Sequence, residues 1–480
     1  MHDRSRNHPR ECGAGKVLGV LAALAFLLWL PETVRAETLL QALTAAYQNN
    51  PVINSQRAQL RATDESLAEA QSGYRPSVSG QAEMGNQRTE VDGRASSTSP
   101  YGVSVQVVQP IFDGYETVSA VREAKANIEA GRAQLRSVEQ RTLLSAVAAY
   151  ADVIRDQAIV QLRENNVGVL SRELRATEER FAVGEVTKTD VAPARARRAG
   201  AVSALDLARA NLRSSLGTYE QLVGHPAGAL SEPGIPTHLI PYSLEEAIGL
   251  GQSQNPDVIA AAYLEEAAVH NIKRVEAFML PQVQVDASFT ERFDPSPVVK
   301  RSETAQIFAR MSVPFYQGGQ VAAQVRGAKE QRHSRLEDIE TARLQVRSDV
   351  ITAWSQYDAA KAQLVSDRVQ VDATRIALEG VREEEKVGQR TLLDVLNAEQ
   401  EFLNAKVSLA GTERDEVVAA FSLISAVGRL SFEDLGLQTD PYDVESHYRE
   451  VNGKAWGITI EREEGYEGYT IEGLQNTPPN

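Results

Sequence analysis

The chain of 480 residues is short of cysteine, aromatic side chains, positive charge and long apolar segments. It has one cysteine, only 6% of its residues are aromatic, and 65 acidic residues outnumber 50 basic ones, for a formal net charge of −15. Binding to a phosphate backbone needs a basic face, so nucleic acid is not expected as the main partner. Hydrophobic residues make up an ordinary 42% of the chain, which argues against a polytopic helical membrane protein. A membrane β-barrel is not excluded, because alternating strands dilute the apolar signal.

The one long apolar run, residues 17–30, is shorter than the roughly 20 residues that a helix needs to cross a bilayer. It follows a basic stretch and leads to Val34-Arg35-Ala36, a small-residue cleavage pattern. Residues 1–36 are therefore predicted to be a secretory signal peptide, with an uncleaved N-terminal anchor as the alternative. Cys12 precedes the apolar run and leaves with the signal, so the mature chain has no cysteine. Its absence suits an oxidising compartment outside the cytoplasm.

The mature chain contains two copies of one pattern. Landmark motifs recur 204 or 205 residues apart: Asn50-Pro51 with Asn255-Pro256, Val107–Gly114 with Met311–Gly318, and Phe181–Val191 with Glu385–Val395. This constant spacing predicts a tandem duplication. The predicted parts are repeats at 37–225 and 242–430, a Pro- and Gly-containing linker at 226–241, and an acidic tail at 431–480, expected to be poorly ordered.

Each repeat predicts the same series of elements. The expected elements are a helical segment (37–73 and 243–279), a strand pair (77–86 with 101–110, and 282–291 with 304–313), a long helix (115–181 and 319–386) and a second helix (188–223 and 392–428). Val103, Val105 and Val107 alternate with polar residues, which is typical of a strand with one apolar face. The polar segments 86–100 and 291–303 are predicted to be loops. At 1.5 Å per residue, each long helix would form a rod of about 100 Å.

Four strands cannot close a membrane barrel, because the smallest barrels need about eight. The strands therefore form a small soluble sheet, or several chains pool theirs. Aromatic residues stand at the four strand ends that share one edge of the sheet: Tyr74, Phe112, Phe278, Phe315 and Tyr316. They predict an aromatic girdle at one membrane interface and favour pooling. The alternative is that they only fill the junction between strands and helices.

The duplicated unit, with Phe181-x-Val183-Gly184-x-x-Thr187-x-x-Asp190-Val191 and the segment Val387–Ala398, resembles the TolC family of outer-membrane efflux ducts over residues 37–430. The resemblance implies a mainly α fold with a small β part. In this family a homotrimer pools twelve strands into one outer-membrane β-barrel, which a periplasmic α-helical coiled-coil tunnel continues.

The same resemblance implies a passive exit duct of a tripartite efflux or type I secretion system, gated at its periplasmic tip. It would lie in the outer membrane, in contact with its lipid, and extend into the periplasm. A periplasmic adaptor (membrane fusion) protein and an inner-membrane ABC or proton-driven transporter are the implied partners. The alternative from another class is a periplasmic coiled-coil structural protein without channel activity.

The tip of the tunnel is expected at the two turns around Gly184 and Gly388. Glycine tolerates the left-handed conformation that stops a helix, and Thr187 and Thr391 are natural caps of the helices that follow. The resemblance implies that these turns contact the adaptor.

The resemblance also assigns charged residues near the tip. Asp394 matches an aspartate that lines the periplasmic entrance, where three copies form an anionic ring that favours cations. Asn397 stands where the family has a second aspartate, so the second ring and the cation selectivity should be weaker. Arg390 matches the arginine that ties neighbouring coils shut, with Thr189 and Asp190 as its expected partners. Glu385 replaces the tyrosine usual at its position, which puts a second tie to Asp190 in doubt.

Signals for catalysis are weak. The five histidines of the mature chain are more than ten residues apart, without metal-ligand spacing, and no nucleotide-binding motif is present outside the signal peptide. The sequence therefore predicts no enzyme and no cofactor, and the energy for transport must come from a partner.

Overall fold

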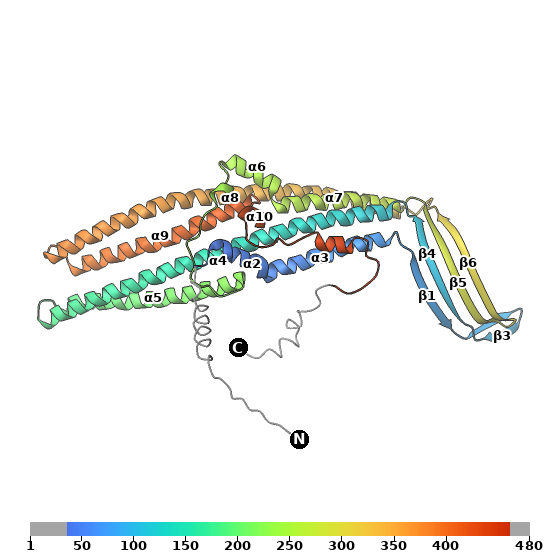
Figure 1. Ribbon diagram of the computed structural model, residues 1–480, viewed down its shortest axis with the longest axis horizontal. Helices are drawn as coiled ribbons and strands as arrows, with labels where there is room; N and C mark the ends of the chain where they lie inside the picture. The colour runs from blue at the N-terminus through green and yellow to red at the C-terminus, as the bar shows by residue number, and fades with distance from the viewer. Residues whose placement is uncertain (1–35, 461–480) are drawn as a thin grey trace, which may run out of the picture.

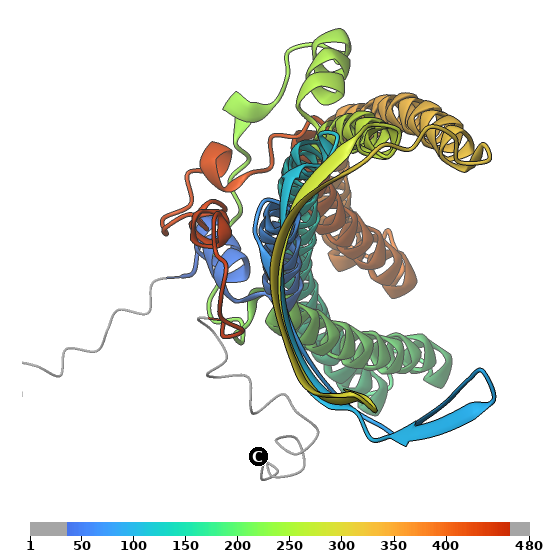
Figure 2. The ribbon, with the colours of Figure 1, turned by 90° about the vertical axis from the view of Figure 1, so that its right-hand side faces the viewer.

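The computed structural model describes residues 36–460. The predicted signal peptide, except Ala36, and the last part of the predicted tail, 461–480, lie outside the described residues. The described chain is an elongated bundle of helices that carries a small sheet at one end (Figure 1). Seen along the bundle, the sheet is curved, and the helical hairpins lie on its concave side (Figure 2).

The predicted order of strand pair, long helix and second helix is present in both halves of the chain. The elements of the first half are α2 (Leu39–Asn49), α3 (Pro51–Ser72), β1 (Ser77–Met84), β2 (Gln87–Val91), β3 (Arg94–Thr98), β4 (Tyr101–Phe112), α4 (Glu116–Ala182) and α5 (Lys188–Val223). Those of the second half are the 3-10 helix η1 (Thr237–Leu239), α6 (Leu244–Gln254), α7 (Pro256–Ala277), β5 (Gln282–Ser296), β6 (Val299–Ser312), α8 (Gln320–Lys386) and α9 (Leu392–Ala426). Two short helices follow, α10 (Phe432–Leu435) and α11 (Ser446–Val451).

Each predicted N-terminal helical segment is two helices, because an Asn-Pro pair interrupts it. Asn50 ends α2 and caps α3, its Oδ1 accepting a hydrogen bond of 2.9 Å from the N–H of Val52, and Pro51 occupies the first helical position. Asn255 does the same between α6 and α7. The amide groups of Asn50 and Asn255 also donate to main-chain carbonyls of α5 and α9, at 2.9 and 3.1 Å. The recurring Asn-Pro motif therefore fixes the end of the second helix in each repeat.

The sheet has four antiparallel strands in the order β1-β4-β5-β6, so β1 and β6 are its edges. The register places Val107, Ala287 and Ile307 side by side across three strands, as an apolar row. On this face Val105 and Ile307 are exposed in the single chain, and Val107 and Ala287 are only partly buried. The alternation predicted from the sequence is thus real, but a single chain leaves the apolar face uncovered.

The two predicted loops between the strands of each pair are largely strand, so that prediction was wrong. Residues 86–100 contain the hairpin of β2 and β3, which turns at Asp92 and Gly93 with φ values of 52° and 81°. An Asp-Gly pair with positive φ is a favoured hairpin turn. In the second repeat β5 and β6 extend to Ser296 and Val299. Polar composition concealed these strands, because most side chains on both faces of β2 and β3 are exposed and those at the end of β5 are only partly buried.

The main helical core lies where α2, α4, α5 and α9 meet, and Tyr150, Tyr219 and Phe421 are its largest buried side chains. The hydroxyl of Tyr150 donates towards the main-chain carbonyls of Glu37 and Ser231, at 2.8 and 2.7 Å. It thereby ties Glu37, the predicted first residue of the mature chain, and the predicted linker to α4.

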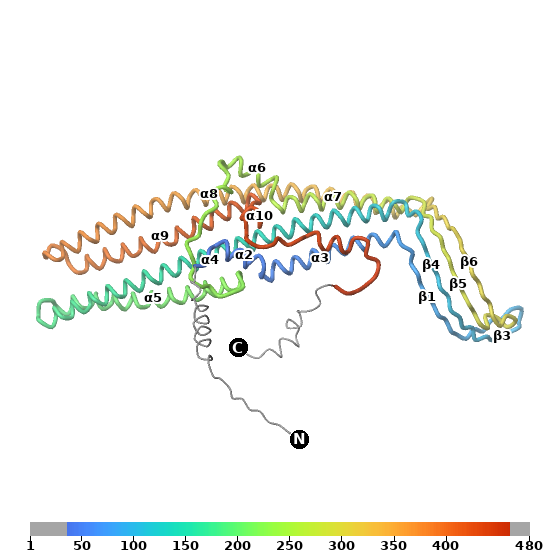
Figure 3. Tube along the Cα trace, viewed as in Figure 1, coloured from blue at the N-terminus to red at the C-terminus, as the bar shows by residue number. Residues whose placement is uncertain are grey.

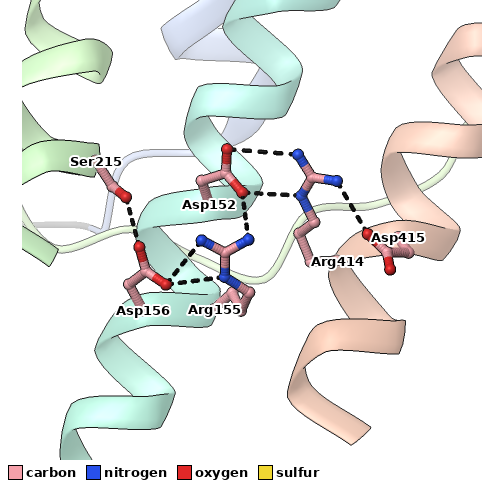
Figure 4. A network of polar contacts seen from close by, with 6 residues as sticks. All are labelled: Asp152, Arg155, Asp156, Ser215, Arg414 and Asp415. Carbon is pink, nitrogen blue, oxygen red and sulfur yellow. Dashed lines mark hydrogen bonds and ion pairs between the residues drawn. The ribbon is translucent and has the colours of Figure 1, made fainter. Parts of the chain in front are cut away.

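A polar network beside this core joins three helices (Figure 4). Asp156 of α4 accepts a hydrogen bond of 2.5 Å from Ser215 of α5 and pairs with Arg155 at 2.8 Å. Asp152 of α4 pairs with Arg414 of α9 at 2.9 Å. The network therefore fixes α5 and α9 on either side of α4.

The predicted poorly ordered tail is largely structured within the described residues. Leu435 and Leu437 belong to the main core, and Val451 of α11 is buried. α11 lies along α3 (Figure 1), and further on Arg75 donates to the carbonyl of Lys454 at 2.7 Å. We call residues 431–454 the C-terminal strap. Its few apolar residues are widely spaced in an acidic segment, which is why composition alone suggested a tail without a core.

Candidate functional site at the helical tip

The two turns that join α4 to α5 and α8 to α9 lie together at the end of the molecule opposite the sheet (Figure 3). Gly184 and Gly388 have φ values of 80° and 77°, which confirms the predicted left-handed helix stops. One residue later, the N–H groups of Glu185 and Gln389 each donate back to a carbonyl of the last helical turn, at 2.9 Å. The two turns therefore have the same geometry.

Thr187 and Thr391 cap α5 and α9, as predicted, but each cap includes an aspartate. The carboxylate of Asp190 accepts from the N–H of Thr187 at 2.8 Å, and that of Asp394 accepts from the N–H of Thr391 at 3.0 Å. These hydrogen bonds, first those from the main chain, lower the pKa of both carboxyl groups. The family resemblance implies only an electrostatic role for Asp394, but its carboxylate also completes a capping box.

Arg390 pairs with Glu384 of its own chain, Nε to Oε2, at 2.8 Å. Both side chains are about half exposed. Within residues 36–460 of the single chain, no hydrogen bond or ion pair joins Arg390 to Thr189 or Asp190. The tie to Thr189 and Asp190 would join neighbouring copies, and it stays a prediction.

Two contacts between the hairpins were not predicted from the sequence. Arg180 of α4 pairs with Glu385 of α8 at 3.3 Å, so the residue that replaces the family's tyrosine has a partner after all. Arg197 of α5 donates to Oδ1 of Asn397 of α9 at 2.7 Å. The recurrence of motifs could not reveal the first pair, because Arg180 and Glu385 do not occupy equivalent positions of the two repeats. No pattern in the sequence singled out Arg197.

A small apolar cluster supports these contacts from inside. Leu396 of α9 packs with Leu170 of α4 and Ala201 of α5. Asp394 and Asn397 therefore start a helix that is held against the other hairpin, in a fixed position relative to α5.

The predicted aromatic residues gather at the opposite end, where the sheet meets the helices. Tyr74 precedes β1 and Phe278 precedes β5, whereas Phe112 ends β4 and Phe315 and Tyr316 follow β6. Phe315 and Tyr316 are 93% and 88% exposed, which does not fit side chains that only fill a junction. Exposed Tyr115, which stacks edge-on against Phe112 with ring centroids 5.2 Å apart, joins this group and was missed.

Neither a metal site nor a membrane-spanning helix is found in the described part of the chain. Residues 36–460 contain no group of three or more His, Cys, Asp or Glu side chains that could hold a metal ion. None of the helices described there is both long and apolar enough to cross a bilayer.

Known proteins resemble this chain in sequence and in architecture. The family model described as "Outer membrane efflux protein" matches residues 42–225 and 247–429. Outer membrane efflux protein BepC of Brucella suis is 38% identical over 429 residues, which is 89% of this chain and 93% of that protein. Outer membrane protein TolC of Vibrio cholerae is 25% identical over 88% of this chain and 97% of its own length. The solved structure of the Campylobacter jejuni CmeC outer membrane channel covers 94% of this chain and 98% of its own, with a TM-score of 0.74 at 16% identity.

These similarities confirm the predicted fold class, the outer-membrane localisation and the efflux function. The chain belongs to the outer membrane efflux protein family.

Proposed function

We propose that three copies of this chain assemble into an exit duct of the outer membrane that opens and closes at the helical tip. The observation that carries the proposal is the open sheet, whose edge strands β1 and β6 are unpaired and whose apolar face is exposed. Unpaired edges in a lipid environment must be satisfied by closure. Pairing β6 of one copy with β1 of the next would close twelve strands into one barrel. A periplasmic structural protein would have no use for this uncovered apolar face.

The duct is passive in this proposal and carries out no reaction of its own. An inner-membrane ABC or proton-driven transporter supplies the energy, and a periplasmic adaptor protein connects the two. The turns at Gly184, Thr187, Gly388 and Thr391 are the surface proposed for the adaptor, because they are the outermost part of the helical end (Figure 1). The exposed aromatic residues at the sheet junction are proposed to sit at the lipid interface.

The proposed entrance carries a ring of three Asp394 carboxylates. The capping hydrogen bonds from Thr391 lower the pKa of Asp394, which keeps the ring negative under physiological conditions. Asn397, whose oxygen accepts from Arg197, adds no second negative ring. A single ring next to a guanidinium supports modest cation selectivity.

The proposed closing tie runs from Arg390 of one copy to Thr189 and Asp190 of the next. Pro193 supports the choice of Thr189, because it lies four residues further along α5 and has no N–H. The carbonyl of Thr189 thus lacks its usual helical donor and remains open to a guanidinium. Exposed ion pairs are weak, so a moderate force from the adaptor would open such a tie.

Single-channel conductance in planar bilayers tests the tie. Arg390→Ala is expected to raise the conductance several-fold, and Asp190→Asn should do the same, because asparagine keeps an acceptor for the cap but loses the charge. Glu384→Gln is the matched control: it removes the partner that Arg390 has within one chain and should conduct like the unaltered protein.

Unchanged conductance of Arg390→Ala would remove Arg390 from the gate. A rise in Glu384→Gln without a rise in Asp190→Asn would move the tie to the pair within the chain. An unaltered protein that forms no channels and runs as a soluble monomer would contradict the duct itself.

A further inference from the structure

A cleft of about 560 Å³ lies between α4, α5 and α9, on the side of the two tip turns that faces the sheet end of the molecule. Its lining includes Arg163 and Asn166 of α4, Arg197 of α5 and Gln400 of α9. Small residues of α5, Gly200 and Ala204 among them, leave the space open. Figure 2 shows the two hairpins diverging on the concave side of the molecule, the side that would face the interior of a trimeric duct.

The charges in this cleft are unbalanced. Its lining contains two arginines and no acidic residue among the described side chains. Arg163 is half-buried, yet no hydrogen bond or ion pair within residues 36–460 involves its guanidinium. Arg197 contacts Asn397 through one nitrogen, which leaves further N–H groups free to donate.

Neighbouring arginines behave differently. Arg209 of α5 pairs with Glu164 at 2.7 Å, and Arg195 pairs with Glu178 at 2.8 Å. Arg172 of α4 and Arg213 of α5 also lack a partner among the described residues, but both are exposed, whereas Arg163 is half-buried in the lining of the cleft.

Asn166 is a second, independent indication of a ligand. Its side chain lines the cleft, the residue is only 6% exposed, and its amide makes no hydrogen bond with another described residue. The amide is not sealed from the cleft, so a bound group or water can pair with it there. An amide that can donate, in the lining of one cleft with two guanidinium groups, matches an oxyanion with several acceptor atoms.

We propose that this cleft binds a small organic anion that bears carboxylate or phosphate groups. Arg163 and Arg197 would pair with the charged groups, and the amide of Asn166 would donate to one of their oxygens. The volume exceeds what a single inorganic ion needs and lies within the range of small-molecule sites. The assignment to the duct interior rests on the proposed trimer, whereas the binding itself does not.

The position of the cleft near the entrance gives it a role along the path of a transported substrate. Gln400 follows Asp394 by six residues in α9, which is about 9 Å along the helix axis. A substrate that passes the negative ring at the entrance would thus meet three basic clefts. They begin one to two helical turns further on, at Gln400, and reach Arg163, which lies 19 residues, about 28 Å, before the end of α4. This arrangement would hold an anionic substrate, or an anionic group of a larger one, inside the duct.

Isothermal titration of the purified full-length protein in detergent tests the proposal, with citrate and inorganic phosphate as probes at constant ionic strength. Citrate is expected to bind, and at least tenfold more tightly than phosphate. Arg163→Gln should weaken citrate binding about tenfold or more, Asn166→Asp should abolish it, and Arg163→Lys should retain part of it. Arg209→Gln, which removes a paired arginine outside the cleft, is the control and should bind like the unaltered protein.

No citrate binding, or binding that Arg163→Gln leaves unchanged, would overturn the proposal. Equally weak binding of citrate and phosphate would mean a mere accumulation of charge and would overturn it as well. Dissociation of the trimer by Arg163→Gln would show that an acidic group of a neighbouring copy occupies the cleft, against the proposal. Channel conductance measured on the same preparations separates this outcome from a failure of the duct, because a conducting trimer without citrate binding contradicts only the cleft.

Discussion

Asp394 has two roles at once, because its carboxylate completes the cap of α9 and carries the negative charge proposed for the entrance. Asp394→Ala cannot separate the two roles, because it removes the charge and also frays the first turn of α9. Asp394→Asn separates them, because the side-chain carbonyl of asparagine can still accept from Thr391.

For Asp394→Asn we expect several-fold weaker block by hexaamminecobalt(III) applied from the periplasmic side, with unchanged thermal unfolding. Asp358→Asn, an exposed carboxylate in the middle of α8, is the control and should be blocked like the unaltered protein. Because the pKa of Asp394 is lowered, its charge persists below the usual range of aspartate, so the block should be equally strong at pH 7 and pH 5. Equal block of both variants would place Asp394 away from the conduction path.

The residues that local sequence rules placed belong to motifs that recur in both repeats. Gly184, Gly388 and the two threonines could be placed because a helix stop and a cap have local rules. Arg163, Arg180 and Arg197 could not, because their importance depends on which residues of another hairpin lie opposite. That information is tertiary and no local spacing carries it.

At the scale of elements, the period of the apolar residues predicted the strands and long helices well. The bounds of α4 and α8 differ from the prediction by about one residue at either end. The errors fell where sequence is polar on both faces, as in β2 and β3, or where a few apolar residues contact a distant element. The C-terminal strap is of the second kind. Leu435 and Leu437 pack in the core that α2, α4, α5 and α9 form, and all of these helices except α9 lie more than 200 residues earlier in the chain.

The strap covers a carboxyl group that is poorly placed for ionisation. Asp64 of α3 is 1% exposed, and neither of its carboxylate oxygens has a hydrogen-bond partner among the described residues. Burial raises its pKa to about 6, against the opposing effect of nearby cationic groups. The charged groups around it are His447 and Arg132, which favour ionisation, then Glu65, which opposes it, and Arg61, which favours it.

The sign of the pH dependence follows from this raised pKa. Between the unfolded value near 4 and the folded value of about 6, the folded protein binds more protons, so stability falls as the pH rises through this window. Asp64→Asn cannot ionise and should escape that loss. We expect its midpoint of thermal unfolding to exceed that of the unaltered protein by a few degrees at pH 8, and the difference to vanish near pH 4.

Glu69→Gln, on an exposed position of the same helix, is the matched control for this experiment and should show no such difference. Limited proteolysis of the strap at pH 8 gives a second readout, in which Asp64→Asn should be cut more slowly. A difference that is the same at pH 4 and pH 8 would mean that the substitution acts through packing and not through the charge.

At the scale of the whole molecule, the single chain is incomplete in its helices as well as in its sheet. α8 carries exposed apolar side chains at heptad-like spacing along its length: Leu344, Ile351, Val365, Val369 and Ile376. Such a stripe is typical of a helix that packs against another. No element of the described chain covers it, and its length matches a neighbouring hairpin of a second copy better than any compact partner.

Val369→Asp therefore tests whether the assembly closes through this stripe. Val369 is 65% exposed in the single chain, and burying a carboxylate there against an apolar neighbour would be strongly unfavourable. We expect the variant to run as monomers in light-scattering chromatography in detergent, to lose cross-linked trimers and to lose channel activity. Val298→Asp is the control, because Val298 is 90% exposed at the turn between β5 and β6, far from the helices, and should leave the trimer intact. If Val369→Asp remained a trimer, the stripe would face water or the duct interior, and the contact between copies would have to rest on the sheet edges alone. That outcome is hard to reconcile with two helices of 67 residues each, because a barrel that closes at one end would leave them without lateral support over most of their length.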